Sequence, residues 1–264
     1  MTEFALVTGA ASGMGRQYAM KLHEMGFGIV AVDRDSEGLE RLCAELPVSS
    51  AAPPAFIQVL QDLSAEGAAE AVREAFRKAA GPDAVLRILV NNAGMLFTSK
   101  IADTPPGRLR SMMMVHCVTP LLLCRLFLPE MEASGGGYIL NVSSICAWMD
   151  WPAIGMYGNT KRFVKGYSRS LRIETRGTGV SVTTAIFGAV DTPLFGFSER
   201  TRRILRRAGI MISPEKAVQK ALDAMLKKRA RCFPGLVGRI MVPLLPLLPD
   251  ALLAHLLRRY GKYL

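Results

Sequence analysis

A phenol and an ammonium group stand four residues apart in the segment MYGNTK, residues 156–161. Tyr157 and Lys161 would share one face of a helix expected over residues 154–176. Tyrosine ordinarily titrates at about 10, and a neighbouring cation favours the phenolate. We therefore expect Lys161 to lower the pKa of Tyr157 and to make the phenol usable as a general base or acid. This spacing is common on helices and does not by itself indicate catalysis. Other motifs in the chain must show whether the pair has a catalytic role.

Three glycines in TGAASGMG, residues 8–15, follow a short apolar segment that predicts a strand over residues 4–8. Glycine allows positive φ and lets backbone N–H groups approach a diphosphate at the start of the next helix. A glycine-rich loop in the first strand–helix unit therefore predicts nucleotide binding. The loop residues expected to contact the nucleotide are Thr8, Gly9, Ser12, Gly13, Met14 and Gly15.

Asp33 ends the second expected strand and is followed by Arg34. A carboxylate at this point can accept hydrogen bonds from both ribose hydroxyls and repels a 2′-phosphate, which favours NAD over NADP. The guanidinium of Arg34 could instead pair with that phosphate, so NADP stays open. Asp33 could also be an ordinary turn residue at the end of a strand.

Apolar strands and longer helical segments alternate along the first two thirds of the chain. Strands are expected at 4–8, 28–33, 55–60, 86–91, 138–143 and 180–186, and helices at 13–26, 36–46, 64–80, 106–133 and 154–176. Pro120 is expected to kink the fourth helix. The alternation predicts a single α/β domain, a doubly wound parallel sheet with helices on both faces.

Taken in order, these motifs resemble the short-chain dehydrogenases/reductases. TGAASGMG resembles the family's TGxxxGxG, NNAG at 91–94 matches its NNAG, and YGNTK at 157–161 fits YxxxK. FGAVDT at 187–192 resembles its PG…T stretch, with Phe187 where proline is usual. The resemblance runs from about residue 4 to residue 192, the expected cofactor and catalytic core. It implies a Rossmann-type fold and hydride transfer between nicotinamide and a carbonyl or alcohol carbon.

The resemblance also implies roles for individual residues. Ser144, thirteen residues before Tyr157, would hydrogen-bond the substrate oxygen, whereas Ser143 would bond backbone. Tyr157 would be the acid–base group, and Lys161 would also bind the nicotinamide ribose. Further cofactor contacts are implied for Asp62 beside the adenine and for Leu63, Asn91, Ala93, Gly94, Gly188, Val190 and Thr192.

One position departs from the family pattern. Many members carry an active-site asparagine that holds a water between the lysine and solvent. It lies thirteen residues before the proline of a Leu-Pro pair, and here this count from Pro129 gives His116. His116 would either replace the asparagine in a proton relay or be a histidine with its hydrogen bonds satisfied inside the helix. Both interpretations stay open.

Residues 193–212 correspond to the family's substrate lid and contain five arginines, at 200, 202, 203, 206 and 207. The arginines form either a solvated helix face or a receptor for the phosphate of a carrier-bound acyl group. Apolar side chains could wall the pocket or simply pack in the core: Trp148, Met149, Trp151, Phe195 and Phe197. An apolar pocket suits an alicyclic substrate such as a hydroxysteroid, and also a retinoid or a fatty acyl chain.

The sequence thus favours an NAD(P)-dependent alcohol/ketone oxidoreductase similar to hydroxysteroid dehydrogenases. A 3-oxoacyl-thioester reductase is the alternative enzyme, and a nucleotide-sensing protein without catalysis is the alternative from another class. The net charge of +11 is not accompanied by a nucleic-acid-binding motif. Five scattered cysteines, without CxxC, indicate reduced thiols and no metal site.

Residues 213–264 are expected to form an apolar, helical C-terminal extension. Prolines at 243, 246 and 249 interrupt it, so we expect no transmembrane helix there. Asp250 could cap a short helix that packs on protein, although peripheral membrane contact stays open. Because the chain begins MTEFALVTG, with no room for a secretory signal, we expect a cytoplasmic protein. The family resemblance suggests a homodimer or homotetramer.

Overall fold

The computed structural model describes residues 2–46, 55–148, 154–196, 198–234 and 247–260. Within these residues the central sheet has seven parallel strands in the order β3-β2-β1-β4-β5-β6-β9. The strands are β1 (Glu3–Thr8), β2 (Gly28–Asp33), β3 (Phe56–Leu60), β4 (Val85–Asn91), β5 (Gly137–Ser144), β6 (Val180–Phe187) and β9 (Arg231–Cys232). The strand order reverses between β1 and β4, and ligands of such sheets bind outside the carboxyl ends of the strands at this point.

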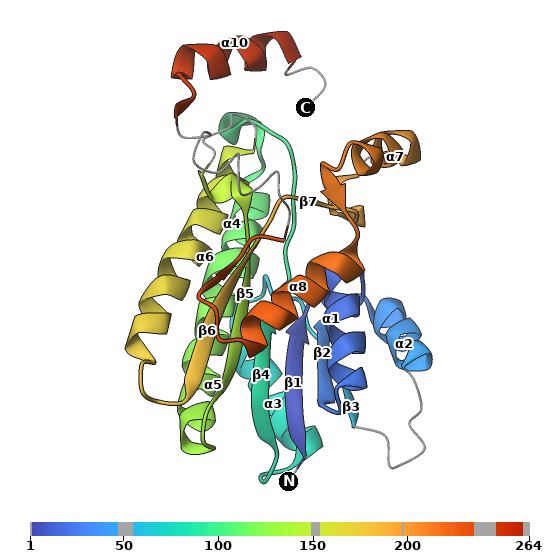
Figure 1. The fold of residues 1–264 in the computed structure, drawn as a ribbon, viewed down its shortest axis with the longest axis vertical. Helices are drawn as coiled ribbons and strands as arrows, with labels where there is room; N and C mark the ends of the chain where they lie inside the picture. Colours follow the sequence, from blue (N-terminus) through green and yellow to red (C-terminus); the bar gives the residue numbers. More distant parts are fainter. Residues whose placement is uncertain (1, 47–54, 149–153, 197, 235–246, 261–264) are drawn as a thin grey trace.

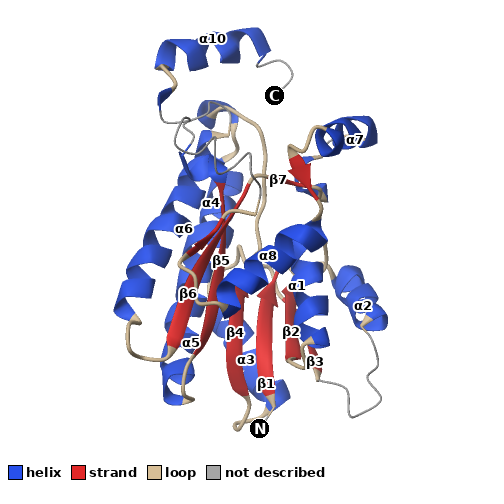
Figure 2. Cartoon of the chain, in the orientation of Figure 1, coloured by secondary structure: helices blue, strands red, loops and turns tan. Residues whose placement is uncertain are grey.

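Helices cover both faces of the sheet, which confirms the doubly wound α/β prediction (Figures 1 and 2). The helices α1 (Gly13–Glu24), α2 (Ser36–Glu45) and α8 (Pro214–Leu226) share one buried apolar cluster. The opposite face is covered by α3 (Ala68–Ala80), α5 (Thr119–Ala133) and α6 (Gly155–Glu174), which contribute to a second cluster. Two extended apolar layers thus hold the strand ends in fixed positions.

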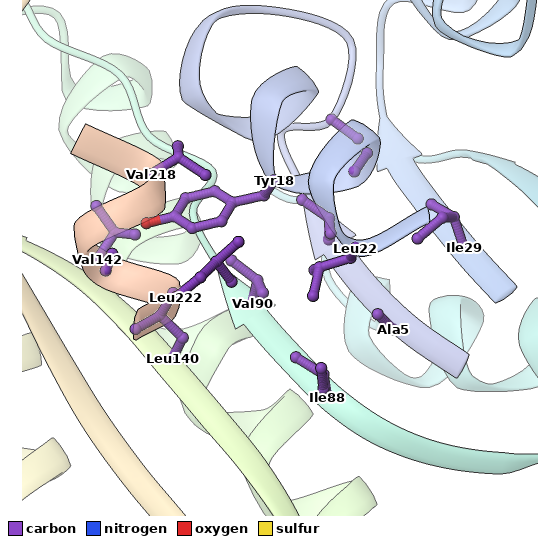
Figure 3. Packing of buried hydrophobic residues seen from close by; sticks show 14 of the residues in the cluster. Ala5, Tyr18, Leu22, Ile29, Ile88, Val90, Leu140, Val142, Val218 and Leu222 are labelled. Atoms are coloured by element: carbon purple, nitrogen blue, oxygen red, sulfur yellow. The ribbon is translucent and has the colours of Figure 1, made fainter. Parts of the chain in front are cut away.

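The segment after residue 212 is more deeply built into the fold than the sequence analysis assumed. Figure 3 shows Val218 and Leu222 of α8 packed with Tyr18 of α1 over Val90 and Leu140 of the sheet. β9 then pairs with β6 at the edge of the sheet. Among the described helices after residue 212, α10 (Asp250–Tyr260), at the top of Figure 1, lies apart from these layers.

The long helical region contains an irregular turn close to the expected kink. It runs as α4 (Pro106–Met113), a π-helical turn (Met114–Val118) and α5. The N–H of Thr119 bonds the carbonyl of Met114, five residues back, just before Pro120. Such π turns are frequent at functional sites, and this one directs His116 and Cys117 into the protein.

The same run, Pro106–Ala133, is long and apolar enough to cross a membrane, by length and composition only. Its α5 portion packs against β4, β5 and β6 and contributes Leu123, Phe127 and Met131 to the core. Core helices of this kind pass the same test, so we interpret the run as part of the helical layer.

Two differences from the expected elements have local causes. α3 begins at Ala68 rather than residue 64, because the backbone N–H and hydroxyl of Ser64 bond Asp62 and Gly67 has a φ of 73°. The lid region contains a 3-10 turn (Pro193–Phe195), α7 (Glu199–Arg207) and a small sheet of β7 (Ala189–Val190) with β8 (Met211–Ile212). Short 3-10 turns also span Ile101–Asp103 and Ile145–Trp148. Two-residue strands are too short to show a period of two in the sequence.

Candidate active site

A cavity of about 440 Å³ opens at the carboxyl ends of the central strands. It brings together most of the residues selected from the sequence, although they are spread from residue 9 to residue 192. These are Gly9, Ser12, Gly13, Met14, Asp33, Arg34, Asp62, Leu63, Ala93, Gly94, Ser144, Tyr157, Lys161, Gly188, Val190 and Thr192. The cavity is within the size range of small-molecule sites in proteins.

The glycine loop is closely fitted against the neighbouring NNAG loop. A Cβ atom on Gly9, whose φ is 69°, would lie 2.9 Å from the Cα of Ala93, and a Cβ on Gly15 would overlap the carbonyl oxygen of Gly9. Ser12, the N-cap residue of α1, makes no side-chain cap, and the first turn contains no acidic residue. Unpaired N–H groups at a helix N-terminus attract anions, so this wall fits the diphosphate of a dinucleotide.

The end of the cavity expected to hold the adenosine carries three carboxylates and one guanidinium, those of Asp33, Asp35, Asp62 and Arg34. The carboxylate of Asp33 accepts hydrogen bonds from the backbone N–H of Ala11 at 3.0 Å and of Arg34 at 2.7 Å. These bonds fix it beside the glycine loop, where its remaining lone pairs can accept ribose hydroxyls. Hydrogen bonds from Ser64 lower the pKa of Asp62, and the nearby Arg34 acts in the same direction.

Three residues expected to contact the cofactor lie behind the cavity wall. The hydroxyl of Thr8 accepts hydrogen bonds from the N–H groups of Asn92 and Ala93, at 3.0 and 3.1 Å. The amide of Asn91 is buried and donates to Asn141 at 2.8 Å. Thr8, Gly15 and Asn91 therefore shape the site, whereas Asn92, which the sequence analysis did not select, lines it.

The three residues of the expected catalytic set converge where β5 ends and α6 begins. Lys161 is buried and donates from Nζ to the carbonyl of Val142 at 3.1 Å. The hydroxyl of Ser143 donates to the carbonyl of Lys161 at 2.9 Å, which fastens β5 to α6. Ser144 accepts the N–H of Cys146 at 3.2 Å and hydrogen-bonds Tyr157. The hydroxyls of both serines at the end of β5 therefore take part in hydrogen bonds at the junction of β5 and α6.

The electrostatics of this junction differ from the expectation for Tyr157. Burial raises the pKa of Tyr157 well above its usual value, the nearby Cys146 adds to this, and the hydrogen bond with Ser144 opposes it. Burial also lowers the pKa of Lys161 to about 8. The expectation that Lys161 lowers the pKa of Tyr157 is therefore wrong, because burial of the phenol is the largest cause of its pKa shift.

His116 has partners on both ring nitrogens. Its Nε2 accepts the backbone N–H of Met95 at 2.9 Å, and its Nδ1 lies 2.8 Å from the hydroxyl of Thr160. The imidazole stands edge-on to the Tyr157 ring, with 5.6 Å between centroids. Burial lowers the pKa of His116 well below its usual value, and Lys161 acts in the same direction. These contacts match the interpretation of a satisfied histidine. The sequence analysis did not select Thr160, which lies one turn after Tyr157.

The apolar residues chosen for the substrate side are only partly described. Trp148 does not line the cavity, since its ring packs near Phe233 and the Nζ of Lys165 lies 4.1 Å above it. Met149, Trp151 and Phe197 lie outside the described residues, and so does the side chain of Phe195. Among described residues, the apolar part of the lining includes Met95, Pro193 and Leu194.

Two of the five arginines of α7 pair with Asp191, and none of the five lines the cavity. The carboxylate of Asp191 is largely buried and pairs with Nε of Arg202 at 2.5 Å and with Arg206 at 2.8 Å. Arg206 also pairs with Glu199 at 2.7 Å. Asp191 was not selected from the sequence, where an acidic residue in FGAVDT had no visible partner.

Known proteins resemble both the sequence and the fold. Residues 3–203 match the family model for short chain dehydrogenase. The 17-beta-hydroxysteroid dehydrogenase type 3 of Homo sapiens is 30% identical over 197 residues, which cover 74% of this chain and 61% of that protein. The chain thus spans about three fifths of the length of the first curated relatives it matches.

Solved structures cover more of the chain. A 7beta-hydroxysteroid dehydrogenase superposes with a TM-score of 0.80 at 27% identity, covering 91% of this chain and 90% of that one. A 3-ketoacyl-(acyl-carrier-protein) reductase from Brucella melitensis complexed with NADH gives a TM-score of 0.72 at 28% identity, covering 84% and 90%.

Proposed function

The chain belongs to the short-chain dehydrogenase family, and from this premise we propose that it interconverts a secondary alcohol and a ketone with a nicotinamide dinucleotide as hydride carrier. The proposed substrate is hydrophobic and alicyclic, such as a hydroxysteroid. The observation that carries the proposal is the meeting of Ser144, Tyr157 and Lys161 in the same cavity as the glycine loop and the uncapped start of α1.

Each residue of this set has a part that follows from its geometry. When bound beside these residues, a nicotinamide would supply the hydride for ketone reduction. The phenol of Tyr157, kept neutral by burial, donates its proton to the carbonyl oxygen, and Ser144 hydrogen-bonds the same oxygen. The phenolate left behind is stabilised by the nearby ammonium of Lys161, whose Nζ lies 5.7 Å from the Tyr157 ring centroid. In alcohol oxidation the phenolate takes the proton back.

The choice of substrate class is supported by two observations. Hydroxysteroid dehydrogenases are among the proteins similar to this chain in sequence and in structure. The competing 3-oxoacyl-thioester reductase would need the arginines of α7 around the mouth of the cavity. In the described residues, Arg202 and Arg206 are paired with Asp191 and Glu199, and no arginine of α7 lines the cavity.

The preferred cofactor in this proposal is NAD. The carboxylate of Asp33, held at the rim by Ala11 and Arg34 backbone N–H groups, favours a free ribose. Titrations of the protein with NADH and NADPH, followed by cofactor fluorescence, test this preference. We expect NADH to bind more tightly, and Arg34→Ala to weaken NADPH while leaving NADH unchanged. Tighter binding of NADPH to the parent protein would reverse the assignment.

We also propose a homo-oligomer formed through α5 and α6. Leu121 and Phe163, which lie on these helices, are both exposed. Light scattering with size-exclusion chromatography tests this, and a monomer at micromolar concentration would contradict it.

The activity itself is tested by a spectrophotometric panel. NAD and NADP are paired with steroid, retinoid, sugar and acyl-thioester substrates, in both reaction directions. Turnover of a steroid with no turnover of acyl thioesters is the expected result. Turnover of 3-oxoacyl thioesters alone would favour the competing enzyme. Tight cofactor binding without any turnover would favour a nucleotide sensor.

A further inference from the structure

His116 connects the loop after the NNAG motif with α6, the helix that carries Tyr157 and Lys161. It stands on the π-helical turn Met114–Val118 and is 1% exposed. On one side its Nε2 accepts the N–H of Met95, in the loop that follows the NNAG motif. On the other side its Nδ1 meets the hydroxyl of Thr160, and that hydroxyl donates to the carbonyl of Tyr157 at 2.7 Å. A continuous chain of hydrogen bonds thus joins Met95 to Tyr157.

The direction of every bond in this chain is fixed by its two ends. A backbone N–H can only donate, so Nε2 of His116 carries no proton. A backbone carbonyl can only accept, so the single proton of the Thr160 hydroxyl points to Tyr157. Nδ1 therefore holds the proton of the neutral imidazole and donates it to Thr160. No lone pair or N–H of the ring remains for a water molecule or for Lys161.

The surroundings of the ring also oppose a second proton. Protonating Nε2 would break the bond from Met95 and would place a buried cation near the ammonium of Lys161. Tyr157 packs against the ring, and the buried Cys117 follows His116 on its own turn. A Cβ atom on Gly94 would lie 3.3 Å from Nε2 of His116 and 3.7 Å from Nζ of Lys161. The loop that carries the NNAG motif, residues 91–94, therefore passes close to both groups.

We propose that His116, with Thr160, is a positioning pair that sets the distance between Tyr157 and the loop that carries NNAG and Met95. In this proposal the imidazole stays neutral during turnover, with its single proton on Nδ1, and takes up no second proton. This interpretation replaces the proton relay that the position of His116 suggested. It deepens the proposed function, and its kinetic test rests on that function. A first measurement is therefore chosen that needs no turnover.

The first measurement is nitrogen NMR of protein labelled with ¹⁵N-histidine. The sequence contains three histidines, and the variants His23→Gln and His255→Gln assign the other two. We expect His116 to give the neutral pattern, with the proton on Nδ1, unchanged from pH 5 to pH 9. Protonation within this range, or a proton on Nε2, would overturn the proposal whether or not the protein proves to be an oxidoreductase.

The second measurement uses variants that interrupt this chain at different points, with one that preserves it. In His116→Gln the carboxamide oxygen can replace Nε2 toward Met95, and in His116→Asn the amide NH₂ can replace Nδ1 toward Thr160. Thr160→Val removes the hydroxyl with little change in shape, and Thr160→Ser keeps it. We expect His116→Gln, His116→Asn and Thr160→Val each to lower turnover about tenfold, because each interrupts the buried hydrogen-bond chain. Thr160→Ser should restore most of the rate, and the exposed His255→Asn serves as the control.

The pH profile separates positioning from proton transfer. If the pair positions the loop that carries NNAG and Met95, the His116 variants and Thr160→Val keep the parental pH dependence, and His116→Gln combined with Thr160→Val is no worse than either single change. If His116 relays protons, the His116 variants lose one of the pH-dependent changes in rate that the parent shows, and Thr160→Val retains it. That second outcome, or a parental rate in Thr160→Val, would contradict the proposal.

Discussion

Lys161 donates its Nζ hydrogen bond to the carbonyl of Val142, 3.1 Å away at the end of β5. The lysine thereby stays beside Tyr157 and Gly94, and its burial lowers its pKa to about 8. The protein therefore keeps a charged group in its interior at neutral pH, where it costs stability. Activity and stability should respond to this single group in opposite ways.

The first prediction concerns pH. The kcat/KM for the reduced cofactor reports the enzyme before the cofactor binds. In that state Tyr157 remains a neutral acid, since burial raises its pKa, whereas Lys161 loses its charge above pH of about 8. We expect ketone reduction to be constant between about pH 6 and 7 and to fall as pH rises through Lys161's pKa. Lys161→Arg should move this fall to higher pH. A flat profile to pH 10 in the parent would contradict the assignment.

The second prediction concerns stability. The pKa of Lys161 is about 8 in the folded protein, against 10.5 for an ordinary lysine. Between these values the unfolded chain binds more protons, so this group's contribution to stability rises with pH, and it is unfavourable at pH 7. Lys161→Met should raise the free energy of unfolding at pH 7 by about 1–3 kcal/mol while abolishing turnover.

Urea unfolding at pH 7 and pH 10 measures this effect. The advantage of Lys161→Met should shrink at the higher pH. The exposed Lys78→Met provides the control and should show no such pH dependence. Lower stability of Lys161→Met at pH 7 would show that the bond to Val142 outweighs the buried charge.

The third prediction concerns the lid. Asp191 lies between Val190 and Thr192, both of which line the cavity, and it holds Arg202 and Arg206 of α7. Asp191→Asn should weaken both ion pairs, and we expect the cofactor Kd to rise about three- to tenfold, since the arginines are partly exposed and screened. Glu199→Gln, a change to a mostly exposed partner of Arg206, should have a much smaller effect. Equal effects of the two substitutions would contradict a specific role for Asp191.

The fourth prediction compares two glycines. A Cβ atom on Gly15 would overlap the carbonyl of Gly9, so Gly15→Ala must displace the glycine loop. Overpacking of this kind costs roughly 1–3 kcal/mol, and cofactor affinity should fall about ten- to hundredfold. Gly166 on the exposed side of α6 has no atoms within 4 Å of a built Cβ. Gly166→Ala should keep cofactor affinity and stabilise the protein by about 0.5–1 kcal/mol. Unchanged cofactor affinity in Gly15→Ala would argue against the tight fit of the loop.

The sequence predicted those parts of the molecule that follow from local patterns. Alternating apolar segments indicated the sheet and its covering helices, and the glycine loop, Asp33 and the Tyr157–Lys161 pair mark positions that converge on one cavity. These residues could be selected from their position at or just after the end of an expected strand. The carboxyl ends of parallel strands lie at the same edge of the sheet, so residues selected in this way come together.

Other features depend on contacts between distant segments. Asp191 acquires its role only from arginines eleven and fifteen residues later, and Thr160 only from His116 on another helix. The pKa of Tyr157 was predicted in the wrong direction, because a sequence shows the neighbouring lysine but not the depth of burial. The inclusion of α8 in the core was missed for the same reason, since its apolar residues reveal no partner until α1 is placed against them.

The central claim is that Tyr157 transfers the proton in a hydride-transfer reaction, and one variant tests it most directly. Tyr157→Phe removes the hydroxyl and leaves the ring that packs against His116. With the best substrate from the panel, we expect turnover to fall by at least about a hundredfold, the lower contribution of general acid–base catalysis, while NADH fluorescence shows an unchanged cofactor Kd. Parental turnover in Tyr157→Phe, with the cofactor bound, would contradict the mechanism.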